Sequence, residues 1–361
     1  MRLAFFNWRD IKNPLAGGAE VYVHRVMARL AESGHKATLF TSTFPGAPPH
    51  EDIDGVEHIR YGGRYSIFPK APLCYRRHIR GRYDAIIESI NGVPFFTPLY
   101  AKEKIVPFIH QLTRENWYSG ISFPLAFAGY HCEDAMLSIY RHRPAIVPSE
   151  STRSDLERLG FDDVTVIKGA ADIRQTCKTK EKASTLLYLG RLTKSKRVDH
   201  ALRAFAQILR PHPEARMWVA GSGPEEPALK RLASGLGISD SVIFMGRVDE
   251  RTKADLLSKA HMLMLPAVRE GWGLVVLEAN ACGTPALGYD VPGLRDSIKA
   301  GVNGFLVPDG DVGALSRRAI SMLDDGSTLR RLSSGSKKYS EGFCWDKTAD
   351  RFESLLEKVV I

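Results

Sequence analysis

Residues 269–279 read Arg-Glu-Gly-Trp-Gly-Leu-Val-Val-Leu-Glu-Ala. Two glycines end a loop and an apolar helical pattern begins near Gly273, so the first amides of the helix can face an anion. Glu270 precedes the helix. Glu278 lies about a turn and a half into it, among apolar neighbours that make an unpaired carboxylate costly to bury. The stretch predicts a ligand-binding loop-to-helix turn of an open α/β sheet.

The alternation of strand and helix patterns continues from this stretch toward both ends of the chain, which is typical of doubly wound parallel sheets. A polar stretch at 173–184 interrupts it and predicts a linker. We therefore expect Rossmann-like domains at 1–172 and 185–343, followed by a terminal helix within 344–361. The expected strands are 2–7, 37–41, 85–90, 105–110, 145–149 and 164–168, then 185–189, 216–220, 242–245, 261–265, 285–288 and 304–307.

The composition is that of an ordinary globular protein, with 361 residues, 44% of them hydrophobic, which suits two domains. The N-terminus lacks a signal-peptide pattern, and no apolar run approaches the ~20 residues that cross a bilayer. Five cysteines without a Cys-x-x-Cys pair argue against disulfides and structural zinc, and fit a reducing cytoplasm. The net charge of +9 predicts an anionic partner, either a phosphorylated ligand, a nucleic acid or a lipid surface.

Three further turns follow expected strands and could meet a diphosphate through backbone amides and fixed cations. Ala-Gly-Gly-Ala-Glu at 16–20 suits close backbone approach or a plain turn. In Gly-Arg-Leu-Thr-Lys-Ser-Lys-Arg at 190–197, Arg191 and Lys196 can bind phosphate, unless the loop is only a solvated basic run. Gly-Ser-Gly-Pro at 221–224 lacks the third glycine of a dinucleotide fingerprint and predicts a compact turn.

Taken together, these motifs resemble a known family. Glu-Gly-Trp-Gly-Leu-x-x-x-Glu at 270–278, downstream of Gly-Arg-Leu-x-x-x-Lys and Gly-Ser-Gly-Pro, is similar to the retaining GT-B glycosyltransferases of family 4, also called glycosyl transferases group 1. The resemblance covers essentially the whole chain, from Gly-Gly-Ala-Glu at 17–20 to Trp-Asp-Lys-Thr-Ala at 345–349. It implies two Rossmann-like doubly wound domains facing across a cleft, with the terminal helix crossing back to the N-terminal domain.

The resemblance also implies roles for individual residues. Glu278 would bind the ribose hydroxyls of a nucleotide-sugar donor, and Glu270 the hydroxyls of its sugar. Arg191 and Lys196 would neutralise the diphosphate. The expected catalytic residues are thus Glu270, Arg191 and Lys196, with His110 near the reactive face of the sugar. The remaining positions are the amides of Gly273, Leu274 and Val275 at the phosphates or sugar, Gly246 and Arg247 near the base, and Gly17 and Gly18 at the acceptor and diphosphate.

Two departures from the family pattern put local geometry in doubt. Val-Ile-Lys-Gly-Ala-Ala-Asp at 166–172 replaces the more usual Pro-Asn-Gly hinge, and Arg197 stands where glycine is frequent. Asp-x-Asp triplets at 52–54 and 309–311 lie in an expected polar loop and in a turn before a helix, and we interpret both as structural. Since no other residues have metal-ligand spacing, we expect no metal site and no cofactor.

We therefore expect a metal-independent hexosyltransferase that moves a sugar from a nucleoside diphosphate to a lipid-linked or glycan acceptor in glycoconjugate or cell-envelope synthesis. For retention, the family implies front-face substitution, in which the leaving phosphate helps deprotonate the acceptor. A uridine nucleotide is expected first and a guanosine nucleotide second. The alternatives are a GT-B-like nucleotide-sugar epimerase and a non-catalytic nucleotide-binding module, whereas a nicotinamide-dependent oxidoreductase would need the missing fingerprint.

The basic charge gathers between residues 60 and 82, a range without a single acid. Aromatic and aliphatic residues interleave with the cations, as at bilayer interfaces, and a second apolar stretch covers 117–127. We expect a monomer or weak dimer in the cytoplasm, peripheral on the inner membrane face, and no nucleic-acid partner. The basic residues are Arg60, Arg64, Lys70, Arg76, Arg77, Arg80 and Arg82, and the apolar ones are Tyr61, Tyr65, Ile67, Phe68, Leu73, Tyr75 and Ile79.

Overall fold

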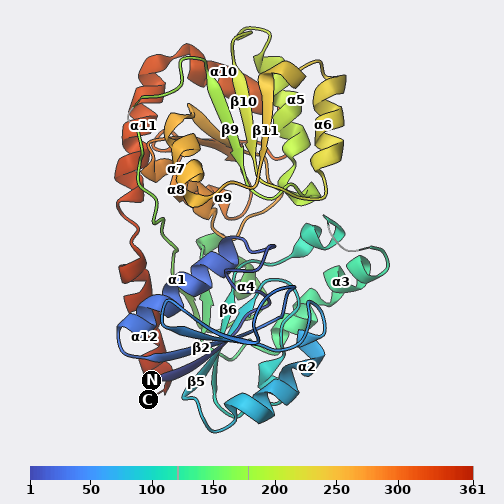
Figure 1. Ribbon diagram of the computed structural model, residues 1–361, viewed down its shortest axis with the longest axis vertical. Helices are drawn as coiled ribbons and strands as arrows, with labels where there is room; N and C mark the ends of the chain where they lie inside the picture. The colour runs from blue at the N-terminus through green and yellow to red at the C-terminus, as the bar shows by residue number, and fades with distance from the viewer. Residues whose placement is uncertain (120–121, 178, 361) are drawn as a thin grey trace. The chain divides into compact units, whose positions relative to one another are not determined.

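The structure, a computed structural model, describes residues 1–119, 122–177 and 179–360. It divides into two compact units (Figure 1). The N-terminal unit comprises Met1–Trp117, Phe123–Gly169 and Cys344–Ile361. The C-terminal unit comprises Tyr118–Ser122 and Ala170–Phe343. The chain thus enters the second unit just before the boundary expected at residue 172, and returns to the first with its terminal helix.

The N-terminal unit is built on an eight-stranded sheet in the order β3-β4-β2-β1-β5-β6-β7-β8. Neighbouring strands run parallel except in the β3–β4 hairpin at one edge. The central strands are buried on both faces, which explains their nearly continuous apolar sequences. The strands are β1 Arg2–Phe6, β2 Lys36–Thr41, β3 His50–Ile53, β4 Val56–Arg60, β5 Ala85–Ile90, β6 Lys104–Ile109, β7 Ala145–Val147 and β8 Val164–Val166.

Helices cover both faces of this sheet, and the terminal helix α12 packs along α1 (Figure 1). The Trp345 ring meets Tyr22 edge-on at 5.2 Å, and Phe352 is fully buried against the same tyrosine. Arg29 Nε donates to Asp346 at 2.7 Å. The apolar face of α12 therefore completes the core of the N-terminal unit. The helices are α1 Gly18–Glu32, α2 Ile67–Cys74, α3 Leu125–Ser138, α4 Glu150–Arg158 and α12 Trp345–Val360.

The C-terminal unit holds a six-stranded parallel sheet in the order β11-β10-β9-β12-β13-β14. The strand order reverses between β9 and β12, and at such a switch point open α/β sheets bind their ligands beyond the carboxyl ends of the strands. The strands are β9 Thr185–Leu189, β10 Arg216–Ala220, β11 Val242–Gly246, β12 Met262–Leu265, β13 Ala286–Tyr289 and β14 Gly304–Val307.

Helices α5, α6 and α10 pack together on one face of this sheet, and α7, α8 and α11 on the other (Figure 1). The chain crosses the sheet first from β9 to β11 and then from β12 to β14. Because strand–helix–strand connections are right-handed, the helices of the two directions lie on opposite faces. The helices are α5 Val198–Ile208, α6 Glu226–Gly235, α7 Glu250–Lys259, α8 Leu274–Ala281, α9 Leu294–Ser297, α10 Val312–Asp324 and α11 Gly326–Ser340.

All twelve strands expected from the sequence form, and the structure adds the β3–β4 hairpin. The expected polar loop around 52–54 is therefore wrong, because Asp52 lies in β3 and Asp54 turns the hairpin at φ +53°. The described residues of the 173–184 stretch contain no helix or strand, as expected. They are nevertheless held on the C-terminal unit, since Thr176 N donates to Ser258 Oγ at 3.0 Å.

Candidate donor and acceptor sites

The loops that carry the predicted donor residues follow the carboxyl ends of β9, β10, β11 and β12, and so gather at one edge of the C-terminal sheet. Gly221 and Gly223 let two of them meet. A Cβ on Gly221 would lie 1.9 Å from Gly190 O, and one on Gly223 would lie 2.2 Å from Leu192 O. Leu192 N donates to Ser222 O at 3.0 Å. Gly-Ser-Gly is thus a compact turn, as predicted, whose small residues set the position of the Arg191 loop.

Lys196 and Glu270, from two different loops, form an ion pair. Lys196 Nζ lies 2.5 Å from Glu270 Oε1, and both side chains are 18% exposed. The loops are also joined by backbone, because Val268 N donates to Ser195 O at 2.9 Å. Gly293 supports the arrangement from behind, since a Cβ there would lie 2.1 Å from the carbonyl oxygen of Glu270. The structure therefore brings together two residues predicted from separate motifs.

Glu278 lies on α8 and pairs with Lys253 of α7 at 2.7 Å. Burial raises the pKa of the Glu278 carboxyl, and the Lys253 ammonium opposes that rise. Burial alone would lower the pKa of Lys253, but Glu278 and Glu250 raise it. Lys253 is the partner that a half-buried carboxylate requires. Sequence reasoning missed it, because its only signal is a basic residue in an amphipathic helix.

Helix α8 begins directly after Gly273, which adopts φ +78° at the N-cap. The first N–H groups of a helix have no partner inside it, so the amides of Leu274 and Val275 are placed at the same edge of the sheet as Lys196. Arg191 is exposed on its loop, and its carbonyl accepts from Tyr188 Oη at 2.9 Å. Gly246 ends β11 at φ +64°, and Arg247 after it is exposed.

Arg197, the residue in place of the family's glycine, occupies a left-handed conformation with φ +46°. Its guanidinium pairs with Asp309 and lies 5.9 Å from the Tyr289 ring. This conformation favours glycine, and a residue with a side chain adopts it at a cost of about 1–2 kcal/mol. Asp311 caps α10 by accepting from Ala314 N at 2.7 Å. Both acids of the 309–311 triplet therefore have structural partners.

In the N-terminal unit, His110 follows β6 and is 5% exposed. Its Nε2 lies 2.9 Å from Ser89 Oγ, and burial lowers the pKa of His110 to about 3. The imidazole is therefore neutral throughout the physiological range. Glu133 of α3 shapes the loop that follows, because its carboxylate accepts from Thr113 N at 2.5 Å and Arg114 N at 2.9 Å. No motif pointed to Glu133.

The glycine turn at 16–20 follows β1 in the same unit. Glu20 reaches back from the first turn of α1 and accepts from Gly17 N at 2.7 Å, while Gly18 opens the helix. The same carboxylate pairs with Arg9 at 3.0 Å, with both side chains under 10% exposed. Glu20 therefore acts as a structural clamp that holds the 9–17 loop against α1.

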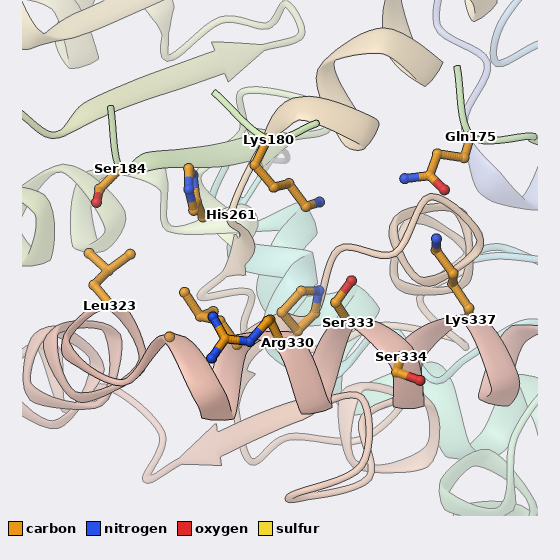
Figure 2. A pocket seen from close by; sticks show the side chains of 12 residues that line it. Gln175, Lys180, Ser184, His261, Leu323, Arg330, Ser333, Ser334 and Lys337 are labelled. Atoms are coloured by element: carbon orange, nitrogen blue, oxygen red, sulfur yellow. The ribbon is translucent and has the colours of Figure 1, made fainter. Parts of the chain in front are cut away.

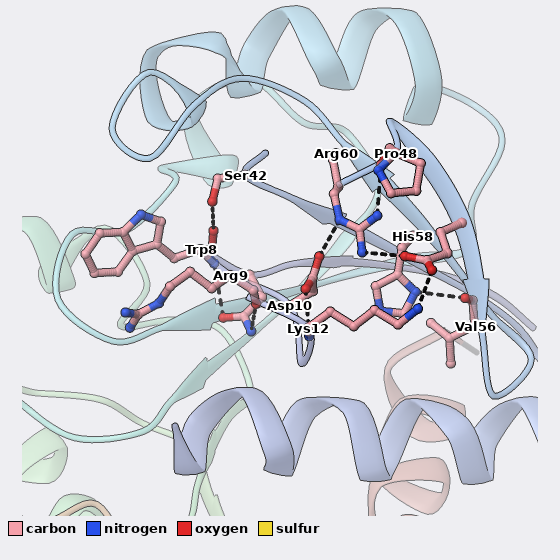
Figure 3. Close-up of polar contacts among 11 residues, drawn as sticks. Trp8, Arg9, Asp10, Lys12, Ser42, Pro48, Val56, His58 and Arg60 are labelled. Carbon is pink, nitrogen blue, oxygen red and sulfur yellow. Dashed lines mark hydrogen bonds and ion pairs between the residues drawn. The ribbon is translucent and has the colours of Figure 1, made fainter. Parts of the chain in front are cut away.

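Arg60 is part of a buried network and not of the predicted basic surface (Figure 3). Its guanidinium donates to Asp10 at 2.6 Å, to Glu51 at 2.8 Å and to the Pro48 carbonyl at 2.8 Å, and its side chain is fully buried. Sequence reasoning counted it as a surface cation because the strand β4 was not predicted.

The remainder of the 60–82 surface is mixed. Ile67, Tyr75 and Ile79 are core residues, which corrects their interpretation as interfacial side chains. Tyr65 and Leu73 are 66% and 54% exposed. The other basic residues are all exposed, namely Arg64, Lys70, Arg76, Arg77, Arg80 and Arg82.

The second predicted apolar surface, 117–127, is also divided. Trp117 is buried, whereas Phe123, Leu125 and Phe127 are 77%, 68% and 49% exposed. Residues 120 and 121 lie outside the described part of the chain. Within the described residues, no cluster of three or more histidine, cysteine or acidic side chains could hold a metal, and no helix is long and apolar enough to span a bilayer.

Known proteins show the same architecture. Residues 170–339 match the family model for glycosyl transferases group 1, and residues 16–175 match that for glycosyltransferase family 4. A D-inositol 3-phosphate glycosyltransferase of Streptomyces bingchenggensis is 32% identical, over 92% of this chain and 83% of its own. Sucrose-phosphate synthase from Thermosynechococcus elongatus has a TM-score of 0.85 at 22% identity, over 99% and 98%. Anabaena HepE in complex with UDP-glucose has a TM-score of 0.78 at 16% identity, over 99% and 100%.

Two Rossmann-like units, each built on a largely parallel sheet, together with the two family matches define a glycosyltransferase of the GT-B fold. The motifs that led to this prediction occupy the loops where such a fold binds its ligands. The chain belongs to glycosyltransferase family 4. The predicted fold class and family are confirmed, and sugar transfer is favoured over the epimerase and binding-module alternatives.

Proposed function

We propose that this chain transfers a sugar from a nucleoside diphosphate sugar to an acceptor hydroxyl with retention of configuration. The C-terminal unit holds the donor and the N-terminal unit the acceptor. The observation that carries the proposal is the convergence of Lys196, Glu270, Glu278 and the start of α8 at one sheet edge. A diphosphate anion there meets the Lys196 ammonium and the first amides of α8. Glu270 and Glu278 are each paired with a lysine, and their remaining lone pairs accept from sugar and ribose hydroxyls.

The leaving diphosphate gains negative charge as the glycosidic bond breaks. Arg191 and Lys196 stabilise that charge, and a diphosphate oxygen accepts the acceptor's proton on the same face of the sugar. No side chain needs to be a strong general base, and the neutral His110 would position hydroxyls by hydrogen bonding. The reaction needs no metal, since these cations neutralise the diphosphate and both Asp-x-Asp triplets have structural partners.

Removing the two cations tests the diphosphate assignment. Arg191→Ala combined with Lys196→Ala is expected to lower kcat by about 10²–10³, because such groups act mainly on the transition state. Glu278→Ala is expected to raise the Kd of the donor nucleotide instead. Lys194→Ala is the matched control, since Lys194 is an exposed cation in the same loop. Near-normal turnover in the double variant would contradict the role of these cations at the diphosphate. Loss of activity in EDTA and its recovery with magnesium would contradict a metal-independent reaction.

A uridine nucleotide is the proposed donor base, with guanosine second. The support is the similarity to HepE, which was solved with UDP-glucose. A thermal-shift screen of nucleoside diphosphates tests the base directly, because a ligand at ~100 times its Kd adds about 2.7 kcal/mol of stability. Stabilisation by GDP but not by UDP would make guanosine, and not uridine, the donor base.

For the acceptor, we propose a small polyol phosphate, on the strength of the D-inositol 3-phosphate glycosyltransferases that align over most of both chains. A lipid-linked or glycan acceptor is the second candidate. The exposed residues of the 64–82 surface and the apolar side chains Phe123, Leu125 and Phe127 favour it. Turnover with soluble polyol phosphates, compared with turnover on detergent-solubilised lipid glycans, distinguishes the two.

The lipid candidate also predicts docking on an anionic membrane. Each basic residue near such a surface contributes about 1 kcal/mol, so the six exposed cations would hold the protein there at moderate salt. Sedimentation with phosphatidylserine-containing vesicles should recover the protein at low salt and release it at high salt. Arg76→Gln with Arg77→Gln should weaken recovery, and Arg60 variants are unsuitable because Arg60 is buried. Recovery in the supernatant under all conditions would end the membrane proposal.

A further inference from the structure

A cavity of about 600 Å³ lies within the C-terminal unit, at the amino ends of its strands (Figure 2). Ser184, His261 and Pro285 line it, and each directly precedes a strand, β9, β12 and β13 respectively. The loops with Lys196 and Glu270 follow the carboxyl ends of β9 and β12. The cavity therefore lies at the opposite edge of the sheet from the candidate donor residues, and is a separate site.

One wall of the cavity is a face of α11. Arg330, Ser333, Ser334 and Lys337 all line it, and their spacing places them along one side of the helix. In Figure 2 the side chain of Lys180 enters from the opposite wall, toward Ser333. The twelve residues that line the cavity include three basic side chains, those of Lys180, Arg330 and Lys337, and no acid. An excess of positive charge around a concave site favours an anionic ligand.

The position of Lys180 is set by the protein. Its Nζ donates to Thr284 Oγ1 at 2.6 Å, while the Thr284 hydroxyl donates to the Leu257 carbonyl. One N–H of the ammonium is thus engaged, and two remain for a ligand. The pKa of Lys180 is lowered to about 8, chiefly by burial and to a smaller extent by the charge of Lys337, against opposing effects of Cys282 and Cys177. A bound anion would relieve the cost of burying this cation.

His261 adds a neutral donor. Its Nδ1 accepts from Thr185 N at 3.0 Å, so the neutral ring carries its proton on Nε2. Burial and then Lys180 lower the pKa of His261, which keeps the ring neutral beside the cations. Pro285, Leu323 and Leu329 supply an apolar part of the lining. The lining thus combines cations and hydroxyls with apolar side chains, a mixture that suits a phosphate joined to a carbon skeleton.

We propose that this cavity binds a small organic phosphate as a ligand distinct from donor and acceptor. Lys180 and Lys337 bind the phosphate, Arg330 adds positive charge toward the end that holds Leu323 (Figure 2), and Leu323 and Leu329 contact the carbon skeleton. Such a ligand contacts both α11 and the segment that carries Gln175, Lys180 and Ser184. Because the cavity exists only in the folded protein, the bound ligand stabilises the C-terminal unit.

Isothermal titration calorimetry of the full chain with glycerol 3-phosphate and inorganic phosphate tests the proposal. Arg330→Gln with Lys337→Gln is expected to weaken binding at least tenfold, since charge-assisted hydrogen bonds are the strong ones. Lys338→Gln is the charge-matched control, because Lys338 is exposed beside Lys337 and does not line the cavity. Arg330→Lys with Lys337→Arg keeps both charges and should bind within about threefold of the natural chain if charge is the main contribution.

Phosphate could also bind at the donor edge, so the Arg191→Ala, Lys196→Ala variant is titrated in parallel. It should retain the glycerol 3-phosphate affinity. Loss in that variant with retention in Arg330→Gln, Lys337→Gln would overturn the cavity site, as would no binding of either probe to the natural chain. Glycerol 3-phosphate should bind several-fold more tightly than inorganic phosphate, and equal affinities would overturn the organic part of the proposal.

Discussion

Glu278 shows how a single residue depends on a neighbour that no motif contains. Its carboxyl is half-buried on α8, and the Lys253 ammonium at 2.7 Å offsets part of the effect of burial on its pKa. An ionised carboxylate accepts two hydroxyl hydrogen bonds, whereas a protonated one accepts fewer. The proposed binding of the ribose hydroxyls therefore requires an ionised Glu278, and the Lys253 ammonium favours that state.

Lys253→Met is expected to raise the pKa of Glu278, because burial would then act without the opposing cation. Affinity for the donor nucleotide should fall as the pH is lowered from 8 to 5, and fall earlier than in the natural chain. The measurement is the Kd of UDP across that range. Glu278→Gln serves as the control, since an amide does not titrate and its affinity should be weak at every pH. Identical pH profiles for Lys253→Met and the natural chain would contradict the role of Lys253.

At the scale of elements, the two loops after β9 and β10 form one structural unit. Gly221 and Gly223 allow their backbones to touch, and backbone hydrogen bonds join Gly190 to Ala220 and Leu192 to Ser222 at 3.0 Å. The Arg191 loop is therefore placed by its neighbour and not by its own sequence. The Gly-Ser-Gly motif contributes no charge, and its role is to let the two loops pack closely together.

Gly221→Ala is expected to push the two loops apart and to weaken UDP binding by about tenfold or more, because a misplaced cation loses its charge-assisted hydrogen bonds. Gly237→Ala is the matched control. Gly237 also has a positive φ, but an added Cβ there meets no atom within 4 Å. Both variants place a side chain at a positive φ, which costs about 1–3 kcal/mol, and only Gly221→Ala also brings a Cβ against a neighbouring loop. Equal UDP affinities in the two variants would show that the loop contact does not position Arg191.

At the scale of the whole molecule, the two structural units do not correspond to two consecutive halves of the sequence. Helix α12 follows the complete C-terminal sheet and yet belongs to the N-terminal unit, where it covers α1. The stability of the first unit therefore depends on a helix that follows the second unit in the sequence. A substitution in α12 should change the stability of the N-terminal unit.

Phe352→Ala removes a fully buried ring, and such truncations cost about 3–5 kcal/mol. We expect calorimetry to show a lowered melting transition for the N-terminal unit alone. The transition that shifts upward with UDP reports the C-terminal unit and should stay in place. Glu357→Ala, an exposed position on the same helix, should leave both transitions unchanged. A uniform fall of both transitions would show that the units do not unfold separately.

Much of the fold followed from the sequence alone, because buried parallel strands are apolar throughout and glycine-bearing turns separate them from helices. The twelve predicted strands and the residues at 190–197 and 270–278 needed no tertiary information. The β3–β4 hairpin was missed, since the polar edge strand His50–Ile53 lacks that apolar pattern.

The pairing of side chains was decided only by the tertiary structure. Arg60 looked like a surface cation, but Glu51 of the adjacent strand β3 and Asp10 from a distant segment of the chain both pair with it. Lys253 and Glu133 have no signature in the sequence, because a charged residue on a helix is usually solvated and only neighbours from other elements bury it. Sequence periodicity determines which face of an element is buried, whereas the burial of a charge depends on residues that other elements bring to it.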